Sequence, residues 1–573
     1  MLQSCIQSVG GVPTLLVNGK PVAAAAYITY FCDQAHYRDF AVAGYRLFSV
    51  PVYFAVQSAS NCVALPPDKR GVYDSIYAGG EPDYAAADRR IQEILEICPD
   101  AWIFPRLDMA LPRAWELAHP EELCDSYLEI DPEHRRRSCF SSSVWADESH
   151  RLLQDFLSHS EAAPYAEHII GYQLADGGCG EWYGFDYQGS VGPRSREAFE
   201  HWCTQTGTEA SLPHYYRFLS LKAAERLMEA AHIAKRCVRG RKIIGSFYGY
   251  TLESVEREHN HHALSAVLRC PDVDFLCSPV SYLNWRSTGQ DNPNHTPLDS
   301  IKLHGKLYFA EQDVRTHLTK APNAHPAFQN GVWAAPPAET AVEIMKMQAS
   351  RALTHGHGFW WFDMWGGWFA DERYMEVARR ARELMESSLS RPRRSAAKAA
   401  VFVDETSFDY VSTESRAGSS VGYQFRRILG LSATPYDIYL ADDFEAVYRQ
   451  YKAYIFLQPY PTECMTRCIG TARQEGRAYR VITPENAWME PQALLEFFRD
   501  AGAGTLADRP CVVYRSESLV FVHTADAGVY RLELPDGSRE LFTGQSYTFP
   551  MALPAGTGYL FSIAENHDTV GNN

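Results

Sequence analysis

Eight short apolar runs recur along the first 390 residues, separated by longer stretches of mixed polarity. They span 21–28, 46–53, 101–108, 168–175, 242–250, 273–279, 306–312 and 358–364. Each run is almost continuously apolar instead of alternating, which is typical of strands buried on both faces of a parallel sheet. The pattern therefore predicts eight buried strands.

Between these runs, apolar residues recur at the spacing of an amphipathic helix. In the segment 84–98, Ile91, Ile94 and Cys98 fall on one helical face. Similar patterns cover 215–237, 338–356 and 372–389. Strands that alternate with helices in this way predict a (β/α)8 TIM barrel over residues 1–390. A doubly wound open sheet is the alternative arrangement.

The pattern changes after a polar linker at 388–398. Three further units of strand and loop follow the run AAVFVDETS, which indicates a small doubly wound, flavodoxin-like α/β domain over 391–503. This segment has no glycine-rich phosphate loop, so nucleotide binding is not indicated. From residue 504 to 573, alternating runs with turn signals such as Pro535-Asp536-Gly537 predict a small antiparallel β-domain, similar to a β-sandwich.

Composition narrows the classes of partner. The chain of 573 residues is 46% hydrophobic, enough for a large core, and its net charge is −16. An acidic chain without a basic tract argues against a nucleic-acid partner. Aromatic residues make up 13%, which suits a site that stacks on sugar rings and equally suits a large aromatic core.

The cysteines and the apolar runs bear on the location of the protein. The 14 cysteines are scattered without a C-x-x-C pair, and the spacing of Cys464 and Cys468 stands alone. Unpaired cysteines in apolar runs favour a reducing compartment. We see no signal peptide and no apolar run of about 20 residues. The cytoplasm is the expected location, without a membrane partner.

Polar and aromatic residues gather where the predicted strands end. In a (β/α)8 barrel, the reacting groups lie at the carboxyl ends of the strands. Reading off those ends, in chain order, gives the candidates Arg106, Asp108, Asp176, Glu181, Tyr248, Tyr282, Glu311, Arg315, Trp361, Asp363, Trp365 and Trp368.

Two carboxyl groups on separate strands, surrounded by aromatic residues, are what cleavage of a glycosidic bond requires. One protonates the leaving oxygen, and the other attacks the anomeric carbon or activates a water. Glu311 is the candidate nucleophile, and its alternative role is a structural pair with Arg315. Glu181 is the candidate acid/base, and Asp176 is its rival. A separation of about 5–5.5 Å gives retention and ~6.5–9.5 Å gives inversion.

The remaining candidates have supporting roles. Arg106 or Arg315 near the nucleophile would keep its carboxylate ionised, and Tyr282 could donate a hydrogen bond to it. Asp363 is a candidate ligand for a substrate hydroxyl, whereas Trp361 serves equally well as barrel filling. His355 and His357 have the spacing of a metal pair, but the first strand has no histidine to match. We expect no metal and no cofactor.

Taken together, the chain resembles clan A glycoside hydrolases, in particular the family 42 β-galactosidases. The resemblance covers the whole chain and is most specific in HIIGYQL before Glu181 and in YFAEQDVRT around Glu311. It implies a middle domain that forms trimers and no nucleotide cofactor. The clan usually has Asn-Glu directly after the fourth strand, where this chain has Asp176-Gly177. Family 164 β-mannosidases are similar in outline, and the four zinc-binding cysteines of some family 42 members are not recognisable.

The sequence thus predicts a retaining, exo-acting β-glycosidase for terminal β-galactosides or β-mannosides. In this interpretation Glu311 forms the glycosyl-enzyme, and Glu181 is the acid/base. Two alternatives remain open. One is a catalytically silent sugar-binding or assembly protein on the same scaffold, and the other is a transglycosylase with the same residues.

Overall fold

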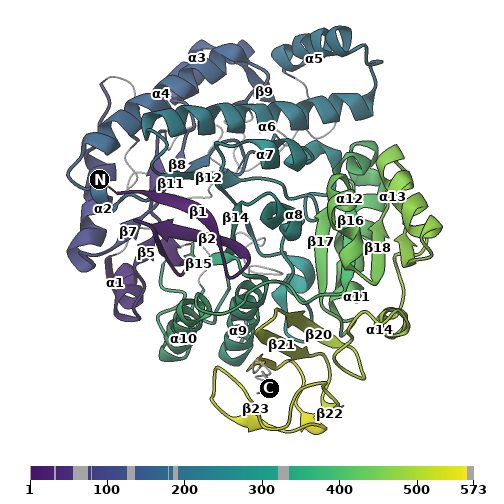
Figure 1. Ribbon diagram of the computed structural model, residues 1–573. Coiled ribbons are helices and arrows are strands. Elements are labelled where there is room, and N and C mark those ends of the chain that lie inside the picture. The colour runs from purple at the N-terminus through teal and green to yellow at the C-terminus, as the bar shows by residue number, and fades with distance from the viewer. Residues whose placement is uncertain are drawn as a thin grey trace, which may run out of the picture.

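The computed structural model describes residues 2–30, 34–55, 75–78, 81–125, 136–178, 180–184, 192–319, 334–364 and 366–563. After a small N-terminal sheet, three groups of sheets follow one another along the chain (Figure 1). The first is a parallel sheet of ten strands, the second a parallel sheet of four, and the third a set of small antiparallel sheets.

The ten parallel strands form a closed barrel of eight strand positions, because two of these positions are each divided into two short strands. They are β4 (Ala25–Thr29), β5 (Leu47–Phe48), β6 (Pro51–Tyr53), β7 (Trp102–Ile103), β8 (Arg106–Asp108), β11 (Gly171–Ala175), β12 (Ile243–Phe247), β13 (Phe275–Pro279), β14 (Leu307–Gln312) and β15 (Gly358–Asp363). β5 and β6 together occupy the second strand position, and β7 and β8 together occupy the third. Strand β4 pairs with β15 and β5, while β8 pairs with β6 and β11, so the ring closes.

Proline explains why the second and third strand positions are divided. Pro51 begins β6, and Pro105 separates β7 from β8; neither residue has an N–H to donate to the ladder. Backbone hydrogen bonds nevertheless cross the break. The Arg106 N–H donates to the Val50 carbonyl at 2.9 Å, and the Gln173 N–H donates to the Pro105 carbonyl at 2.9 Å. The predicted (β/α)8 barrel is confirmed.

Helices surround the barrel. They are α1 (Gln34–Val42), α2 (Ala85–Ile97), α3 (Arg113–Ala118), α4 (Ser143–Ala162), α5 (Pro193–Thr206), α6 (Leu212–Cys237), α7 (Leu264–Arg269), α8 (Leu298–Leu303), α9 (Ala338–His355) and α10 (Glu372–Ser388). The long helices α4 and α6 run side by side across the top of Figure 1. A short hairpin of β9 (Leu123–Asp125) and β10 (Arg136–Ser138) precedes α4.

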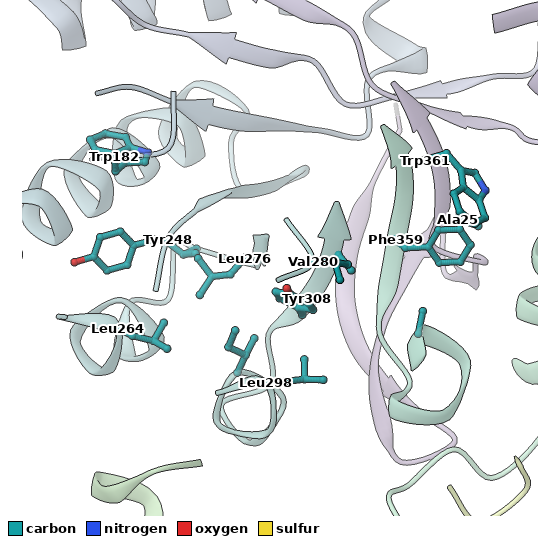
Figure 2. Close-up of a cluster of buried hydrophobic side chains, with 14 of the residues drawn as sticks. Ala25, Trp182, Tyr248, Leu264, Leu276, Val280, Leu298, Tyr308, Phe359 and Trp361 are labelled. Atoms are coloured by element: carbon teal, nitrogen blue, oxygen red, sulfur yellow. The ribbon is translucent and has the colours of Figure 1, made fainter. Parts of the chain in front are cut away.

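Strand alternation separates two apolar layers. The inner layer fills the barrel with aromatic rings, including Phe104 against Phe309 at 5.7 Å and Phe309 against Trp360 at 5.6 Å between centroids. The outer layer lies between the strands and the helices and contains Phe359 and Trp361 (Figure 2). Because every barrel strand is covered on both faces, its run of apolar residues is continuous.

An N-terminal sheet, which the sequence analysis did not anticipate, covers the amino ends of the barrel strands. It consists of β1 (Ser4–Val9), β2 (Val12–Val17) and β3 (Lys20–Pro21). The Ser4 N–H donates to the Arg241 carbonyl at 2.8 Å, and the Ile243 N–H donates to Ser4 Oγ at 3.0 Å. Leu15 joins the same buried cluster as Phe104. The opposite, carboxyl end of the barrel is where the candidate residues lie.

The second sheet has the strand order β17-β16-β18-β19, and all its pairs are parallel. Its strands are β16 (Ala399–Val403), β17 (Tyr436–Leu440), β18 (Ala453–Leu457) and β19 (Ala478–Ile482). Its helices are α11 (Phe425–Gly430), α12 (Phe444–Val447), α13 (Glu463–Gln474) and α14 (Pro491–Asp500). Phe402 and Phe456 face α12 and α13, whereas Val401 packs on the side of α11 and α14. Helices on both faces give the predicted doubly wound, flavodoxin-like fold.

The C-terminal part is antiparallel, also as predicted. β20 (Cys511–Arg515), β21 (Leu519–Thr524) and β26 (Gly558–Ser562) form one sheet. Two small pairs accompany it, β22 (Gly528–Tyr530) with β25 (Met551–Leu553), and β23 (Ser538–Arg539) with β24 (Ser546–Tyr547). The cysteines in the described part of the chain are free thiols. Among the described helices, none combines the length and the apolar character needed to cross a bilayer.

Candidate active site

Glu311 lies near the carboxyl end of β14, with its side chain in the barrel. Its exposed fraction is 3%, and its Oε2 accepts a hydrogen bond from Trp360 Nε1 on the neighbouring strand at 3.2 Å. Arg106 Nη1 lies 3.8 Å from the same oxygen. The Arg106 guanidinium is itself buried, 4.5 Å from the Phe247 ring centroid and 5.2 Å from that of Tyr30. The carboxylate therefore meets one cation and one indole donor in a dry setting.

Burial controls the protonation of this carboxyl group. It raises the pKa of Glu311 to about 7, because removal from water disfavours the charged form. Arg106 and the hydrogen bond from Trp360 act in the opposite direction, while the nearby Asp313 charge raises the pKa further. Glu311 is consequently poised to change its charge near neutral pH.

Asp313, two residues beyond Glu311, is held by two arginines. It forms a buried ion pair with Arg286 and a second one with Arg315, whose Nη1 lies 3.1 Å from Oδ2. The Arg315 guanidinium lies over the Trp368 ring at 4.6 Å. Arg106, and not Arg315, is thus the cation whose contact with Glu311 the structure records. Arg315 orders the loop that follows β14.

Glu181 lies in a tight loop after β11. The Trp182 N–H donates to the Asp176 carbonyl at 2.7 Å, and the Glu181 N–H donates to the Gly178 carbonyl at 3.0 Å. Asp176 Oδ1 accepts from the Gly177 N–H at 2.6 Å, which fits a residue that shapes the turn. Asp176 is buried, whereas Glu181 at the far side of the turn is half-buried.

The two glutamates act on the same buried groups. The charges of Glu181 and Glu311 both raise the pKa of Tyr250, whose main shift comes from burial. Both likewise raise the pKa of Arg106. Gly180, beside Glu181, is packed so closely that a Cβ there would lie 3.3 Å from Arg106 Nη2 and 3.9 Å from Asp108 Oδ2. The loop after β11 and the end of β14 therefore converge on Arg106.

Asp363, at the end of β15, organises the loop that follows it. Its carboxylate accepts from the Tyr27 hydroxyl at 3.0 Å, from the Gly367 N–H at 2.8 Å and from the Trp368 N–H at 3.1 Å. Burial raises the pKa of Asp363 to about 6. Trp368 is buried beneath Arg315, and Trp365 lies outside the described residues.

Tyr248 and Trp361, both expected at the site, belong to the outer layer instead (Figure 2). The Tyr248 hydroxyl donates to the carbonyl oxygens of Ser220 and Asn260, each at 3.1 Å. Trp361 Nε1 donates to the Tyr45 hydroxyl at 2.7 Å. The physical reason is strand alternation, which turns Trp360 inward and its neighbour outward. Trp361 is therefore neither a residue of the site nor filling of the barrel interior, the two roles expected from the sequence, but part of the core between β15 and the surrounding helices.

Tyr282 and Asp108 lie near the charged groups of the site. The Arg286 guanidinium lies over the Tyr282 ring at 4.3 Å, and the charges of Asp313 and Glu181 contribute to the raised pKa of Tyr282, after burial. The Tyr282 ring therefore contacts Arg286 and His295, and among the described residues no hydrogen bond joins Tyr282 to Glu311. Asp108 is buried at the end of β8, and its Oδ1 accepts from the Ala110 N–H at 3.3 Å.

Several residues of the site were missed in the sequence. Trp360 and Tyr30 lie in the inner layer, and Arg286 lies in the loop after β13. Trp360 is the register partner of Glu311 on the neighbouring strand, so both side chains point into the barrel. A register prediction would therefore have identified Trp360. Within the described residues, no cluster of three or more His, Cys, Asp or Glu side chains is suited to a metal ion.

No protein-family model and no curated protein matches the sequence of this chain. Solved structures match its fold. A β-galactosidase from Bacillus circulans sp. alkalophilus is 11% identical, with a TM-score of 0.63, over 94% of this chain and 99% of that chain. A GH42 β-galactosidase from G. stearothermophilus is 12% identical, with a TM-score of 0.59, over 94% and 98%. An exo-carrageenase GH42 from Bacteroides ovatus is 11% identical, with a TM-score of 0.58, over 98% and 84%.

These matches confirm the expected architecture. The chain has the fold of family 42 structures across nearly its whole length, a TIM barrel with additional domains. The sequence identities of 11–12% establish the shared fold and leave the substrate to be argued from the site.

The raised pKa of Glu311 has a consequence for stability. A carboxyl with a pKa of about 7 in the folded chain, against about 4.3 when unfolded, binds more protons in the folded state. Its contribution to stability is therefore present at low pH and is lost as the pH rises through 7. Glu311→Gln removes this loss, so we expect it to stabilise the protein by about 3 kcal/mol more at pH 8 than at pH 4.

Urea unfolding at the two pH values measures this difference, and the same substitution at the exposed Glu517 is the control. A Glu311→Gln effect that does not change between pH 4 and pH 8 would contradict the assigned burial of charge.

Proposed function

We propose that this protein is a retaining, exo-acting β-glycosidase that hydrolyses terminal β-linked hexosides, either β-galactosides or β-mannosides. The convergence of Glu311 and the Glu181 loop on the buried Arg106 carries the proposal. A candidate nucleophile and a candidate acid near the carboxyl end of a barrel, together with the fold match to family 42 β-galactosidases, support this reaction.

In the first step, the Glu311 carboxylate attacks the anomeric carbon while the bond to the leaving oxygen breaks. Glu181 donates its proton to that oxygen, so the aglycone leaves as an alcohol. In the second step, Glu181 takes a proton from a water, and the resulting hydroxide displaces Glu311. Arg106 and Trp360 favour the ionised form of Glu311 and align its Oε2, opposing the effect of burial.

Arg106, Asp108 and Tyr282 are proposed to line the sugar site, with Arg315, Asp363 and Trp368 ordering the loops around it. The sugar 2-hydroxyl is proposed to meet Asp176-Gly177 where the clan usually has Asn-Glu, which accommodates a mannoside as well as a galactoside. We retain the domain division 1–390, 391–503 and 504–573, a cytoplasmic homotrimer formed through the middle domain, and a reaction without cofactor.

A panel of aryl glycosides tests the reaction class. We expect the purified protein to hydrolyse aryl β-D-galactoside or aryl β-D-mannoside, and Glu311→Gln to lower kcat at least ~10⁴-fold because no covalent intermediate forms. The circular dichroism of the variant should match that of the wild type. Activity that survives in Glu311→Gln would refute the nucleophile. If the folded wild-type protein hydrolyses none of the glycosides, the sugar-binding alternative is favoured. Product analysis with sugar acceptors separates hydrolysis from transglycosylation.

Azide distinguishes the two candidate acids. Removing the acid/base opens space for a small anion that needs no general base, so sodium azide should accelerate Glu181→Ala on an activated aryl glycoside and yield the β-glycosyl azide. Asp176→Asn, which keeps an oxygen that accepts from Gly177, should remain within ~10-fold of the wild type. If Glu181→Ala stays near normal while Asp176→Asn loses activity without azide rescue, the acid is Asp176 and the assignment to Glu181 is wrong.

A further inference from the structure

The loop that carries Glu181 has an unusual backbone. Gly177, Gly180 and Trp182 have positive φ angles of 69°, 67° and 61°. Glycine adopts such angles without strain, but a bulky residue such as tryptophan does so at a cost of roughly 1–3 kcal/mol. Contacts from outside the loop must therefore hold the backbone at Glu181 and Trp182 in place.

One anchor is the Trp182 side chain. It is buried, and its Nε1 donates to Ser246 Oγ on β12 at 2.8 Å. Its indole also packs against Phe140, with 5.5 Å between ring centroids. This anchor fixes the residue after Glu181, but it leaves the Glu181 carbonyl oxygen to be held by another group.

That group is His261, in the loop between β12 and α7. His261 Nε2 lies 2.8 Å from the Glu181 carbonyl oxygen, and the Tyr250 N–H donates to His261 Nδ1 at 3.3 Å. A carbonyl oxygen only accepts and a backbone N–H only donates, so the two partners together select the neutral tautomer with its proton on Nε2. His261 thus donates to the backbone of the candidate acid.

The surroundings of His261 keep it neutral and rigid. The side chain is fully buried; its ring is stacked on the Tyr248 ring, 4.9 Å between centroids, and is tilted against the Tyr183 ring at 4.4 Å. Burial lowers the pKa of His261 well below its usual value, and the neighbouring His259 and His262 lower it further. The donor on Nε2 is therefore present throughout the working pH range.

The loop that contains His261 is clamped by the middle domain. Glu405, in the turn after β16, accepts from the N–H groups of Leu264 and Ser265 at 2.6 and 3.2 Å, at the start of α7. His262 donates to the Ser254 carbonyl at 2.8 Å and lies 3.7 Å from Asp409. His261 consequently lies next to a segment that Glu405 and Asp409 hold at His262, Leu264 and Ser265.

We propose that His261 is a positioning residue, which holds the strained backbone at Glu181 so that the carboxyl group meets the leaving oxygen. The inference rests on the proposed function, in which Glu181 is the acid/base. A group displaced by about 1 Å costs on the order of 10²-fold in rate, and only reactions that need the proton should suffer.

The test uses two conservative variants of His261. The amide of Gln reaches the place of Nε2 and keeps the donor to Glu181, whereas the shorter Asn reaches only the place of Nδ1 and keeps the contact with Tyr250. His357→Asn is the matched control, because His357 is also buried and contacts a carbonyl, that of Gly358 at 2.8 Å, but at the amino end of β15. Glu181→Ala is assayed alongside.

The readout is kcat/KM on phenyl and on 2,4-dinitrophenyl β-glycosides of whichever sugar, galactose or mannose, the wild type hydrolyses faster. Phenolate needs a proton to leave and dinitrophenolate does not. We expect His261→Asn to lose about 10- to 100-fold on the phenyl glycoside and less than about 3-fold on the dinitrophenyl glycoside. His261→Gln and His357→Asn should stay within about 3-fold on both.

Hydrogen exchange gives a second readout that needs no substrate. The amides of Gly178, Glu181 and Trp182 all donate within the loop, so a peptide covering 176–184 should exchange faster in His261→Asn than in His357→Asn. Faster exchange together with the loss on the phenyl glycoside supports the proposal. Equal losses of His261→Asn on both glycosides, or no loss, would overturn it even if exchange changes. Absence of the leaving-group effect in Glu181→Ala would instead refute the proposed function, and the inference with it.

Discussion

The candidate active site depends on keeping the charge of Glu311 inside a dry barrel. A carboxylate that is 3% exposed is unfavourable unless cations and donors replace its water. Arg106 and Trp360 supply this replacement, and the aromatic rings of Phe247 and Tyr30 flank the arginine. The balance leaves the pKa of Glu311 at about 7, so the ionised form that the proposed mechanism needs predominates above that pH.

Further buried charges are arranged around this pair. Asp313 repels Glu311, but Arg286 and Arg315 neutralise it, and both guanidinium groups lie on aromatic faces, those of Tyr282 and Trp368. The same principle applies to the loop after β11, where indole and imidazole donors hold a backbone that would otherwise relax. The site is thus preorganised by groups that lie one layer behind the two glutamates.

The sequence is most informative where one physical rule acts alone. Continuous apolar runs predict the eight barrel strands because parallel strands are covered on both faces. The polar residues near the ends of these runs include Arg106 and Glu311. The same continuity hides the direction of each side chain. Trp360 and Trp361 are equally apolar, so only the register with β14 shows which of them meets Glu311.

Long-range contacts could not be predicted from local patterns. Arg286 and His261 lie in loops, and their partners Asp313 and Glu181 are distant in the chain. Tyr248 and Tyr250 are two residues apart and would share a face in a regular strand, yet β12 ends at Phe247 and they enter different layers. The N-terminal sheet was missed because β1 (SCIQSV) is mostly polar and partly exposed, so it lacks the continuous apolar run of a barrel strand. Its role appears only when the barrel is closed.

The most direct measurement of the central claim is covalent trapping of the nucleophile. The protein is incubated with 2-deoxy-2-fluoro-β-D-galactosyl fluoride and, separately, with the mannosyl analogue, and is then digested and analysed by mass spectrometry. The account predicts one fluoroglycosyl group per chain, on the peptide that contains Glu311. Labelling of another carboxylate, such as Glu181 or Asp313, would contradict it, as would turnover of an aryl β-glycoside with inversion at the anomeric carbon.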